Sequence, residues 1–587
     1  MRVDRKARAI GLLVGLSMVA TACGGDDDSG GDVTPKVEGK KGGTLKLQGS
    51  GDVTNLDTAT AYYTVSYTIL RALTRQLVSY PNSPDKAKRD IPVADMVEGT
   101  ADDWRSDDGL TYTFTLKSGL KWGAPVNREV TGQDFVTGIK RLCDPNNPSG
   151  GLIYYTDTIK GLQAFCDGLG KVKVGDVAAV KTFIEGNQIE GVVADGRKIT
   201  ITLKAPAGDF LYMLAMPFAS PVPHEHVLKY LADGPEFRKN FVGNGPYKID
   251  EYVPEKSFKL SRNPNWTEDS DKLRAAWVDK IEVVMGSDEE PTQQAIEAGT
   301  VDLAWDVAVP TVRLSALTRL KDAQLKQEDD GCVSYIVFNP KRKPFDNVKV
   351  RQAVNYAVDK TAIVQVAGGP NVQTPTGNIL TPPILGYKKL DLYPTPDNKG
   401  DPAKAKTLLA EAGYPNGIDP IFIYRSAGKH PTYAATHQAA LLKAGIRAKL
   451  KAVTPAAFYS EHLSKLNSNS WDFAQAGWCP DWAGNAARTF FSPLLDGRTL
   501  KDGTTNYGQY NNPVFNEKLD AALAESDTEK AKPLWAELDE IAMKDAVWAP
   551  IQTGKVSNYH SKRVKNWVYF PFSHQADLTN VYLDPAT

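Results

Sequence analysis

The chain has 587 residues, of which 42% are hydrophobic and 24% charged, and its formal net charge is −1. This composition is that of an ordinary soluble globular protein, and the length is enough for two or more domains. The near balance of acidic and basic side chains excludes the broad basic surface that binding to nucleic acid or another polyanion requires.

The N-terminus has the pattern of an export signal. A basic start is followed by an uncharged, largely apolar run over residues 9–23, which is too short to span a bilayer and is typical of a signal-peptide core. The small residues Ala20–Ala22 precede Cys23 and resemble a bacterial lipobox, which implies a signal peptide of residues 1–22 and a lipid on Cys23. The alternative is an ordinary secreted protein with a chance cysteine.

Residues 23–43 are predicted to form a lipidated, flexible tether. The stretch 24–43 contains only two aliphatic residues and cannot support a hydrophobic core. Residues 1–22 carry a charge of +3, so the chain without them is near −4. A lipid and a tether together predict a folded body that works at the outer face of the cytoplasmic membrane.

Strands and helices alternate along the body. The first strand is expected within residues 42–51. Alternating apolar residues predict further strands at 110–122, 198–206, 334–339, 421–426 and 446–453, and a hairpin-like pair within 241–266. Helical spacing predicts helices at 130–142, 350–364, 401–413 and 434–445, and a last helix within 531–551 that runs into a strand.

Three local signals sharpen this pattern. Thr131 with Asp134 three residues later is a capping box for the first of these helices, and Asp401 before Pro402 is the N-cap of another. The strand, helix and strand over residues 421–453 form a βαβ unit, which requires a parallel sheet. The sequence therefore predicts a mixed α/β protein with at least two lobes.

The cysteine count favours disulfides. Without Cys23, four cysteines remain, and an even number in an exported protein favours two bridges. A local Cys143–Cys166 bridge would leave Cys332 and Cys479 to join two distant segments. The loop-entropy model gives about 3 kcal/mol for the short loop and nearly 5 kcal/mol for the long one. No cysteine and histidine spacing indicates zinc, so no metal is predicted.

Catalytic signatures are weak. The sequence has no GxSxG elbow, no P-loop and no GxGxxG after a strand, so we predict neither catalytic residues nor a cofactor. We interpret His224–His226 as a solvated helix start and His430 and His437 as surface residues. The acidic pairs Asp329-Asp330 and Glu289-Glu290 are interpreted as solvated loops.

Larger blocks carry a family resemblance. In chain order they are GGTLKLQGSGDVTNLD, YTFTLKSGLKW, FVGNGPYKIDEY with SFKLSRNPNW, YIVFNPKRKPFDNVKVRQAVNYAVDKTAIV, DPAKAKTLLAEAGYPNG and AGWCPDW. Together, from about Gly42 to Ile551, they resemble the solute-binding proteins of ABC importers of the oligopeptide/dipeptide/nickel class (family 5). The resemblance implies a type II periplasmic-binding-protein-like fold, in which two α/β lobes joined by two crossover strands close on a ligand.

The resemblance also implies a division of the chain, with an extra subdomain in the N-terminal lobe. The expected parts are lobe I in 44–82 and 205–331, the extra subdomain in 83–204, lobe II in 332–547, and a return to lobe I in 548–587.

The block GWCPDW implies the ligand site. In oligopeptide-binding relatives an acid at the position of Asp481 takes the α-ammonium of the peptide, and a desolvated carboxylate needs such a cation. Backbone groups of Gly477 and Cys479 would pair with an extended peptide main chain, and Trp478 and Trp482 would wall the pocket.

Two further features follow from the resemblance. Relatives join the cysteine of this block to one just before the strand that opens the second lobe, which supports Cys332–Cys479. A second contact segment falls near Tyr62 and Tyr63, where the glutamate of the relatives is absent. The alternative for GWCPDW is a disulfide-tied loop in which Asp481 caps a helix or pairs with an internal arginine.

We therefore expect a lipid-anchored monomer that binds peptides, delivers them to the membrane subunits of an ABC permease and performs no chemistry. The alternatives are a relative that binds a nickel chelate, a sugar or another solute, a receptor that senses peptides without import, and an extracellular hydrolase.

Overall fold

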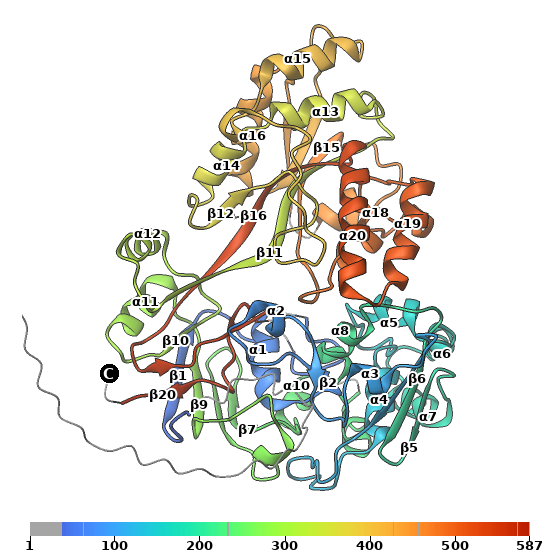
Figure 1. The fold of residues 1–587 in the computed structure, drawn as a ribbon, viewed down its shortest axis with the longest axis vertical. Helices are drawn as coiled ribbons and strands as arrows, with labels where there is room; N and C mark the ends of the chain where they lie inside the picture. Colours follow the sequence, from blue (N-terminus) through green and yellow to red (C-terminus); the bar gives the residue numbers. More distant parts are fainter. Residues whose placement is uncertain are drawn as a thin grey trace, which may run out of the picture.

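The structure, a computed structural model, has two lobes joined by two long strands (Figure 1). It describes residues 38–53, 55–62, 64–231, 234–426, 428–454, 457–571 and 573–585. Residues 1–37, and with them the predicted signal peptide and Cys23, lie outside the described residues. No helix of the described chain is long and apolar enough to cross a membrane.

Lobe I is built on a five-stranded sheet of order β10-β1-β9-β8-β7. Strand β1 pairs in parallel with β9 and β10, and the predicted hairpin is the antiparallel pair of β7 and β8. The strands are β1 (Thr44–Gly49), β7 (Tyr247–Val253), β8 (Ser257–Arg262), β9 (Lys280–Val284) and β10 (Leu303–Trp305), and the helices that accompany them are α1 (Thr64–Leu73), α2 (Lys86–Arg89), α9 (His224–Val227), α10 (Gly234–Lys239), α11 (Glu289–Glu297) and α12 (Thr311–Leu320).

A second part of the lower lobe contains a three-stranded sheet of order β4-β6-β5 and the helices around it, at the lower right of Figure 1. The capping box of α4 is confirmed, because the carboxylate of Asp134 accepts the backbone N–H of Thr131 at 2.9 Å. The elements are α3 (Ala101–Trp104), β4 (Thr111–Thr115), α4 (Gly132–Arg141), α5 (Leu152–Thr158), α6 (Leu162–Leu169), α7 (Val177–Gly186), β5 (Val192–Asp195), β6 (Lys198–Thr202) and α8 (Phe210–Leu214); the two-stranded pair β2 (Val78–Ser79) and β3 (Val93–Ala94) lies alongside.

Lobe II contains a six-stranded sheet of order β12-β16-β11-β15-β13-β14. The predicted βαβ unit is confirmed, since β13 and β14 pair in parallel on either side of α16. Asp401 caps α15 as predicted and accepts the N–H of Lys404 at 2.9 Å. The elements are α13 (Val348–Ala357), α14 (Lys360–Val366), β12 (Gln373–Pro375), α15 (Pro402–Glu411), β13 (Ile421–Arg425), α16 (His430–Lys443), β14 (Lys449–Val453), β15 (Phe473–Trp478), α18 (Arg488–Leu495), α19 (Pro513–Ala524) and α20 (Thr528–Lys544).

The predicted helix over residues 350–364 is in fact two helices, α13 and α14. Val358 has an extended backbone with φ −70° and ψ 134°, and the side chain of Asp359 accepts the N–H of Ala362 at 2.8 Å as the N-cap of α14. An aspartate that can cap a new helix competes with continuation of the old one, which the apolar spacing alone does not reveal.

The two lobes are connected by β11 (Leu325–Phe338) and β16 (Trp548–Tyr559), which pair antiparallel. Their register shifts between Asp329 and Val333, so the ladder is irregular where the strands pass from one lobe to the other. The interpretation of Asp329-Asp330 as a solvated loop is wrong, because both residues lie in β11 and both are only partly exposed. After β16 the chain returns to lobe I and ends in short strands, β17 (Val564–Lys565), β18 (Tyr569–Phe570), β19 (Gln575–Ala576) and β20 (Tyr582–Leu583).

The lobes touch on the side of α5 and α8. The guanidinium of Arg488, in α18 of lobe II, lies 3.3 Å from the carboxylate of Asp209 and 3.0 Å from the hydroxyl of Thr158, both in the lower lobe. Arg488 and Asp209 are both buried. In Figure 1, α19 and α20 stand directly above α5 and α8.

Both expected disulfides are present. Cys143–Cys166 links the end of α4 to α6, and Cys332–Cys479 links β11 to the residue after β15. The antiparallel register, in which Val333 faces Trp478, brings the second pair together. At the other end of the described chain, residues 38–43 of the predicted tether contact lobe I, where the N–H of Gly42 donates to Trp277 at 2.8 Å.

Candidate functional site

A cavity of ≈ 640 Å³ lies between the lobes beside the crossover strands. Its walls come from α1, α2 and the β18–β19 turn of lobe I, from the crossover strand β11, and from β13 and β15 of lobe II. A concave, mixed polar and apolar cavity between two domains is the usual place for a small ligand. The segment Gly477–Gly484 contributes one continuous stretch of this wall.

This segment is held in place by the sheet and by the disulfide. Gly477 faces Ser334 in the ladder between β15 and β11, and Cys479 is bridged to Cys332. Pro480 follows, and a Cβ on Gly331 would lie 2.8 Å from its ring, so the two strands remain in contact beyond the bridge. The geometry fixes where the chain leaves the sheet and turns Asp481 into the cavity.

Asp481 is bound by two tyrosines of the lower lobe. The hydroxyl of Tyr62 donates to one carboxylate oxygen, and the hydroxyl of Tyr154, in α5, donates to the other. Within the described residues no lysine, arginine or histidine nitrogen lies within 4.0 Å of this carboxylate. The alternative in which Asp481 pairs with an internal arginine or caps a helix is therefore wrong for the described chain.

The electrostatic state of Asp481 follows from these contacts. Burial raises its pKa, and the hydrogen bonds from Tyr154 and Tyr62 offset only part of that rise. A buried carboxylate without a cation carries an uncompensated desolvation cost, which a bound ammonium group would remove. Asp481 is thus a carboxyl group that accepts two hydrogen bonds and has no cationic partner within the described residues.

The two tryptophans of the block have different positions. Trp478 is partly exposed, lines the cavity and donates its indole N–H to Thr489 at 2.8 Å. Trp482 is buried, and its ring meets Tyr154 edge-on at 4.9 Å between centroids. Both tryptophans line the cavity, as predicted, with Trp478 the more exposed of the two. Trp482 also packs against the tyrosine that binds Asp481.

Of the four other residues predicted for the site, three lie at the cavity. Gly477 and Cys479 line the cavity, and Tyr62 lies at its edge with 47% of its surface exposed. Tyr62 also packs on Phe218 at 5.6 Å between ring centroids. Tyr63 lies outside the described residues.

Tyr154 and Arg425 are the residues that the sequence analysis missed. Tyr154 lies between the bridged Cys143 and Cys166 in a short helix without a distinctive pattern. Arg425 ends β13 and lines the cavity, and its Nε is buried without a hydrogen-bond partner in the described chain. The guanidinium packs on the rings of Phe458 and Tyr459 at 5.9 and 5.6 Å. For Arg425, the only sign in the sequence of a role in the site is its position as a charged residue directly after the apolar run IFIY.

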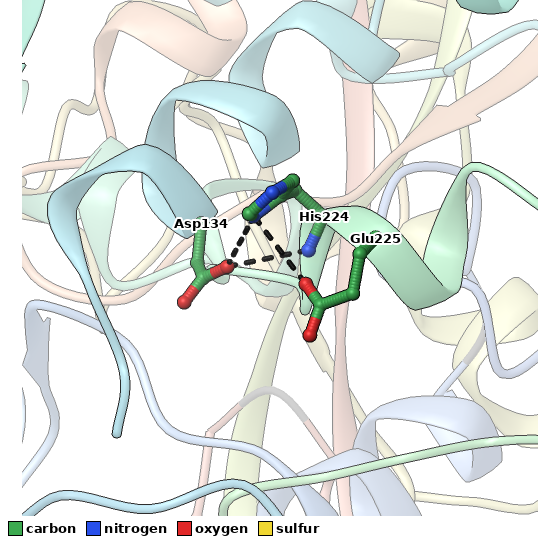
Figure 2. Close-up of side chains that lie close together, drawn as sticks. All are labelled: Asp134, His224 and Glu225. Carbon is green, nitrogen blue, oxygen red and sulfur yellow. Dashed lines mark hydrogen bonds and ion pairs between the residues drawn. The ribbon is translucent and has the colours of Figure 1, made fainter. Parts of the chain in front are cut away.

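A second group of side chains has the composition of a metal site. Asp134, His224 and Glu225 lie with their ligand atoms within 4.8 Å of one another, and the imidazole points toward both carboxylates (Figure 2). The guanidinium of Arg128, however, lies 2.6 Å from Asp134 and 2.5 Å from Glu225. Because this guanidinium already occupies the space between the two carboxylates and pairs with both, we assign the group a structural role at the start of α9.

The surface interpretation of the two histidines in α16 is wrong in part. His437 is buried against Phe422, and burial lowers its pKa to about 3. His430 is partly exposed. Four alanines flank His437 at 434, 435, 439 and 440, so its helix has no strongly apolar face in the sequence.

The fold and the cleft define a class, that of two-lobed α/β binding proteins. A family model, that of the bacterial extracellular solute-binding proteins of family 5, matches residues 95–502. The chain belongs to this family of extracellular solute-binding proteins.

Individual relatives agree. Heme-binding protein A of Haemophilus influenzae is 30% identical over 497 residues, which cover 82% of this chain and 83% of the relative. The periplasmic oligopeptide-binding protein OppA of Salmonella typhimurium is 26% identical, with 83% of each chain covered. Among solved structures, clavulanic acid biosynthesis oligopeptide binding protein 2 superposes with a TM-score of 0.82 at 26% identity, covering 93% of this chain and 96% of that one. The expected family and the two-lobed fold are confirmed.

Proposed function

We propose that this protein captures peptides between its lobes and delivers them to an ABC permease, tethered to the membrane through a lipid on Cys23. The observation that carries the proposal is Asp481, a cavity-lining carboxylate that two tyrosines bind and no cation pairs within the described chain. The α-ammonium of a peptide supplies the missing charge, and a charge-assisted hydrogen bond is about twice as strong as a neutral one.

Arg425 supports a ligand that carries both charges. Its guanidinium lines the same cavity as Asp481 but comes from β13, two strands away from the crossover strand β11. A peptide has an ammonium group and a carboxylate, so one molecule can meet both side chains. The main chain at Gly477 and Cys479 and the ring of Trp478 would contact the segment between its ends.

A second candidate is a ligand that is not an ordinary peptide. The similar proteins include a heme-binding protein and a glutathione-binding protein, so similarity alone does not select the ligand. Glutathione also carries a free ammonium and free carboxylates, which the same two charges could bind. Heme has no ammonium group and would leave Asp481 unpaired.

Native mass spectrometry of the purified protein tests the proposal, followed by calorimetric titration with a pool of tri- to pentapeptides. We expect a co-purified mass that matches a peptide and saturable binding of the pool. A porphyrin or sugar mass, together with no heat from any peptide, would overturn the proposal. For the anchor, Cys23→Ser should move the protein from the membrane to the soluble fraction.

A further inference from the structure

A second chamber adjoins the ligand cavity. A cavity of ≈ 490 Å³ lies between the crossover strands, α12 and the loop after β10. It shares four wall residues with the first cavity: Thr64, Asp330, Cys332 and His574. The shared wall is the neck between them, and the disulfide of Cys332 forms part of it.

The neck carries an anionic side chain without a cation. Asp330 accepts the N–H of Cys332 at 2.8 Å, and its neighbour Asp329 also lines the first cavity. In the described chain no lysine, arginine or histidine nitrogen lies within 4.0 Å of either carboxylate. Lys555, which faces Asp329 in the strand register, directs its ammonium toward the carbonyl of Pro370 at 3.5 Å instead.

The other groups at the neck do not supply a positive charge. His574 is a neutral imidazole at neutral pH, because burial lowers its pKa to about 4. Arg425 lines the first cavity, where its guanidinium packs on the rings of Phe458 and Tyr459, and it forms no ion pair with Asp330 in the described chain. Burial also raises the pKa of Asp330 to about 6; the hydrogen bond from Cys332 and the more distant charge of Lys429, which forms no ion pair with Asp330 in the described chain, offset only part of that rise.

The charges that line the first cavity favour a ligand with a second positive group. Arg89 is already paired with Asp90 at 2.8 Å. The carboxylates without a cation are then Asp481, Asp329 and Asp330, against Arg425 and the exposed Lys86 at the rim. A peptide with one ammonium and one carboxylate leaves this excess of negative charge in place, and a ligand with a second positive charge removes it.

We propose that the second chamber receives a basic side chain of the bound ligand, an arginine or lysine, with Asp330 as its carboxylate partner at the neck. This proposal rests on the proposed function, because it takes Asp481 as the site of the ligand's ammonium. The chamber, at ≈ 490 Å³, has room for an arginine or lysine side chain. Its wall carries three acids, Asp330, Glu289 and Asp306, against one lysine, Lys555, together with the polar residues Ser557, Asn558, Ser573 and Gln575. The protein therefore selects cationic peptides over neutral ones.

The test compares two series of alanine tetrapeptides. In one, arginine is placed at each position in turn, and in the other citrulline, which has nearly the same shape but no charge, takes its place. Calorimetry on the full-length protein measures the ratio of the two dissociation constants at each position. At one position at least we expect arginine to bind tenfold or more tightly than citrulline.

Two variants locate the effect. Asp330→Asn keeps an acceptor for the N–H of Cys332 and removes the charge, and Ala304→Phe fills the second chamber from β10. Both should bring the ratio to within about threefold of one. Asp107→Asn removes an exposed acid far from the cleft and should leave the ratio at its wild-type value.

The outcomes separate this proposal from the proposed function. A ratio near one at all four positions in the wild type, or a tenfold ratio that persists in Asp330→Asn and Ala304→Phe, would overturn the basic-side-chain chamber while peptide binding stands. Absence of binding by both series would overturn the proposed function and this proposal with it.

Discussion

Two groups of acidic side chains, one buried in lobe I and one partly exposed in the cleft, are stabilised in different ways. In lobe I, Asp95 lies 2.9 Å from both Arg75 and Arg274, and Asp577 lies 3.1 Å from Arg71. In the cleft, Asp481 has only two hydroxyl donors. Burial alone would raise the pKa of each acid, but the charges of Arg274 and Arg75 hold that of Asp95 below its usual range, whereas that of Asp481 stays raised.

The difference indicates which acid stabilises the fold and which one awaits a ligand. A buried charge within a network of partners is costly to break, since removal of one member leaves the others uncompensated. A buried charge without a partner gives the fold nothing and can be neutralised from outside. We therefore expect the fold to depend on Asp95 and, under the proposed function, the binding of ligand to depend on Asp481.

The largest expected effect is on stability. Asp95→Asn leaves Arg274 and Arg75 with a neutral partner in a fully buried site, and we expect the free energy of unfolding to fall by about 3–5 kcal/mol. Urea denaturation followed by tryptophan fluorescence measures it. The affinity of the remaining folded protein for peptide should be unchanged. A loss below about 1 kcal/mol, similar to that of the exposed Asp107→Asn, would contradict the comparison.

In the cleft we expect the opposite: a loss of peptide affinity without a loss of stability. Asp481→Asn should weaken peptide binding at least tenfold, or about 1.4 kcal/mol, because the ligand's ammonium loses its anion. Its urea midpoint without ligand should not decrease, since an amide in place of an unpaired carboxylate removes a desolvation cost. Unchanged affinity in a titration calorimeter would remove Asp481 from the site.

Lowering the pH should abolish peptide binding and the stability of the fold at different pH values. The pKa of Asp481 is raised, so peptide affinity should be full above that value and fall as the pH drops through it. Asp95 and Asp577 have lowered pKa values, so their contribution to stability is present above the unfolded value of about 3.9 and is lost only as the pH falls through the folded ones. Binding should therefore fail at a higher pH than the fold, as titrations paired with circular dichroism can show. If both were lost together, the assignment of roles would not hold.

The smallest effect is expected from the tyrosines. Tyr154→Phe removes one hydrogen bond to Asp481 and should weaken peptide binding about threefold, within the range of about 0.5–1.5 kcal/mol for a single bond. Tyr80→Phe is the matched control, because Tyr80 donates to the carbonyl of Ala483 at 3.1 Å rather than to Asp481. Equal losses in the two variants would show a general effect on lobe contact.

The sequence was sufficient for features that short segments determine. The capping box of Thr131 and Asp134, the N-cap at Asp401 and the βαβ unit of β13, α16 and β14 depend on local chemistry and spacing. The family resemblance predicted the Cys332–Cys479 disulfide and pointed to Asp481 as a residue of the site. It could not supply Tyr154, because a side chain of α5 reaches the loop after β15 only through the tertiary contact between the lobes.

The sequence also did not reveal the position of the acidic side chains where β11 passes between the lobes. Asp329-Asp330 looks like a solvated acidic pair in sequence, and only the course of β11 between the lobes shows that it lines the cleft. Burial of this kind is set by the packing of distant segments and not by the residues themselves.

The most direct measurement is a thermodynamic cycle by calorimetry, in which one change is made in the protein and the other in the ligand. A tetrapeptide with a free amino terminus and its N-acetylated form are each titrated into the wild type and into Asp481→Asn. The account predicts that acetylation weakens binding to the wild type at least tenfold and has little effect on the variant, since the lost ammonium and the lost carboxylate are partners. Equal sensitivity of both proteins to acetylation would contradict the claim that Asp481 binds the ligand's ammonium.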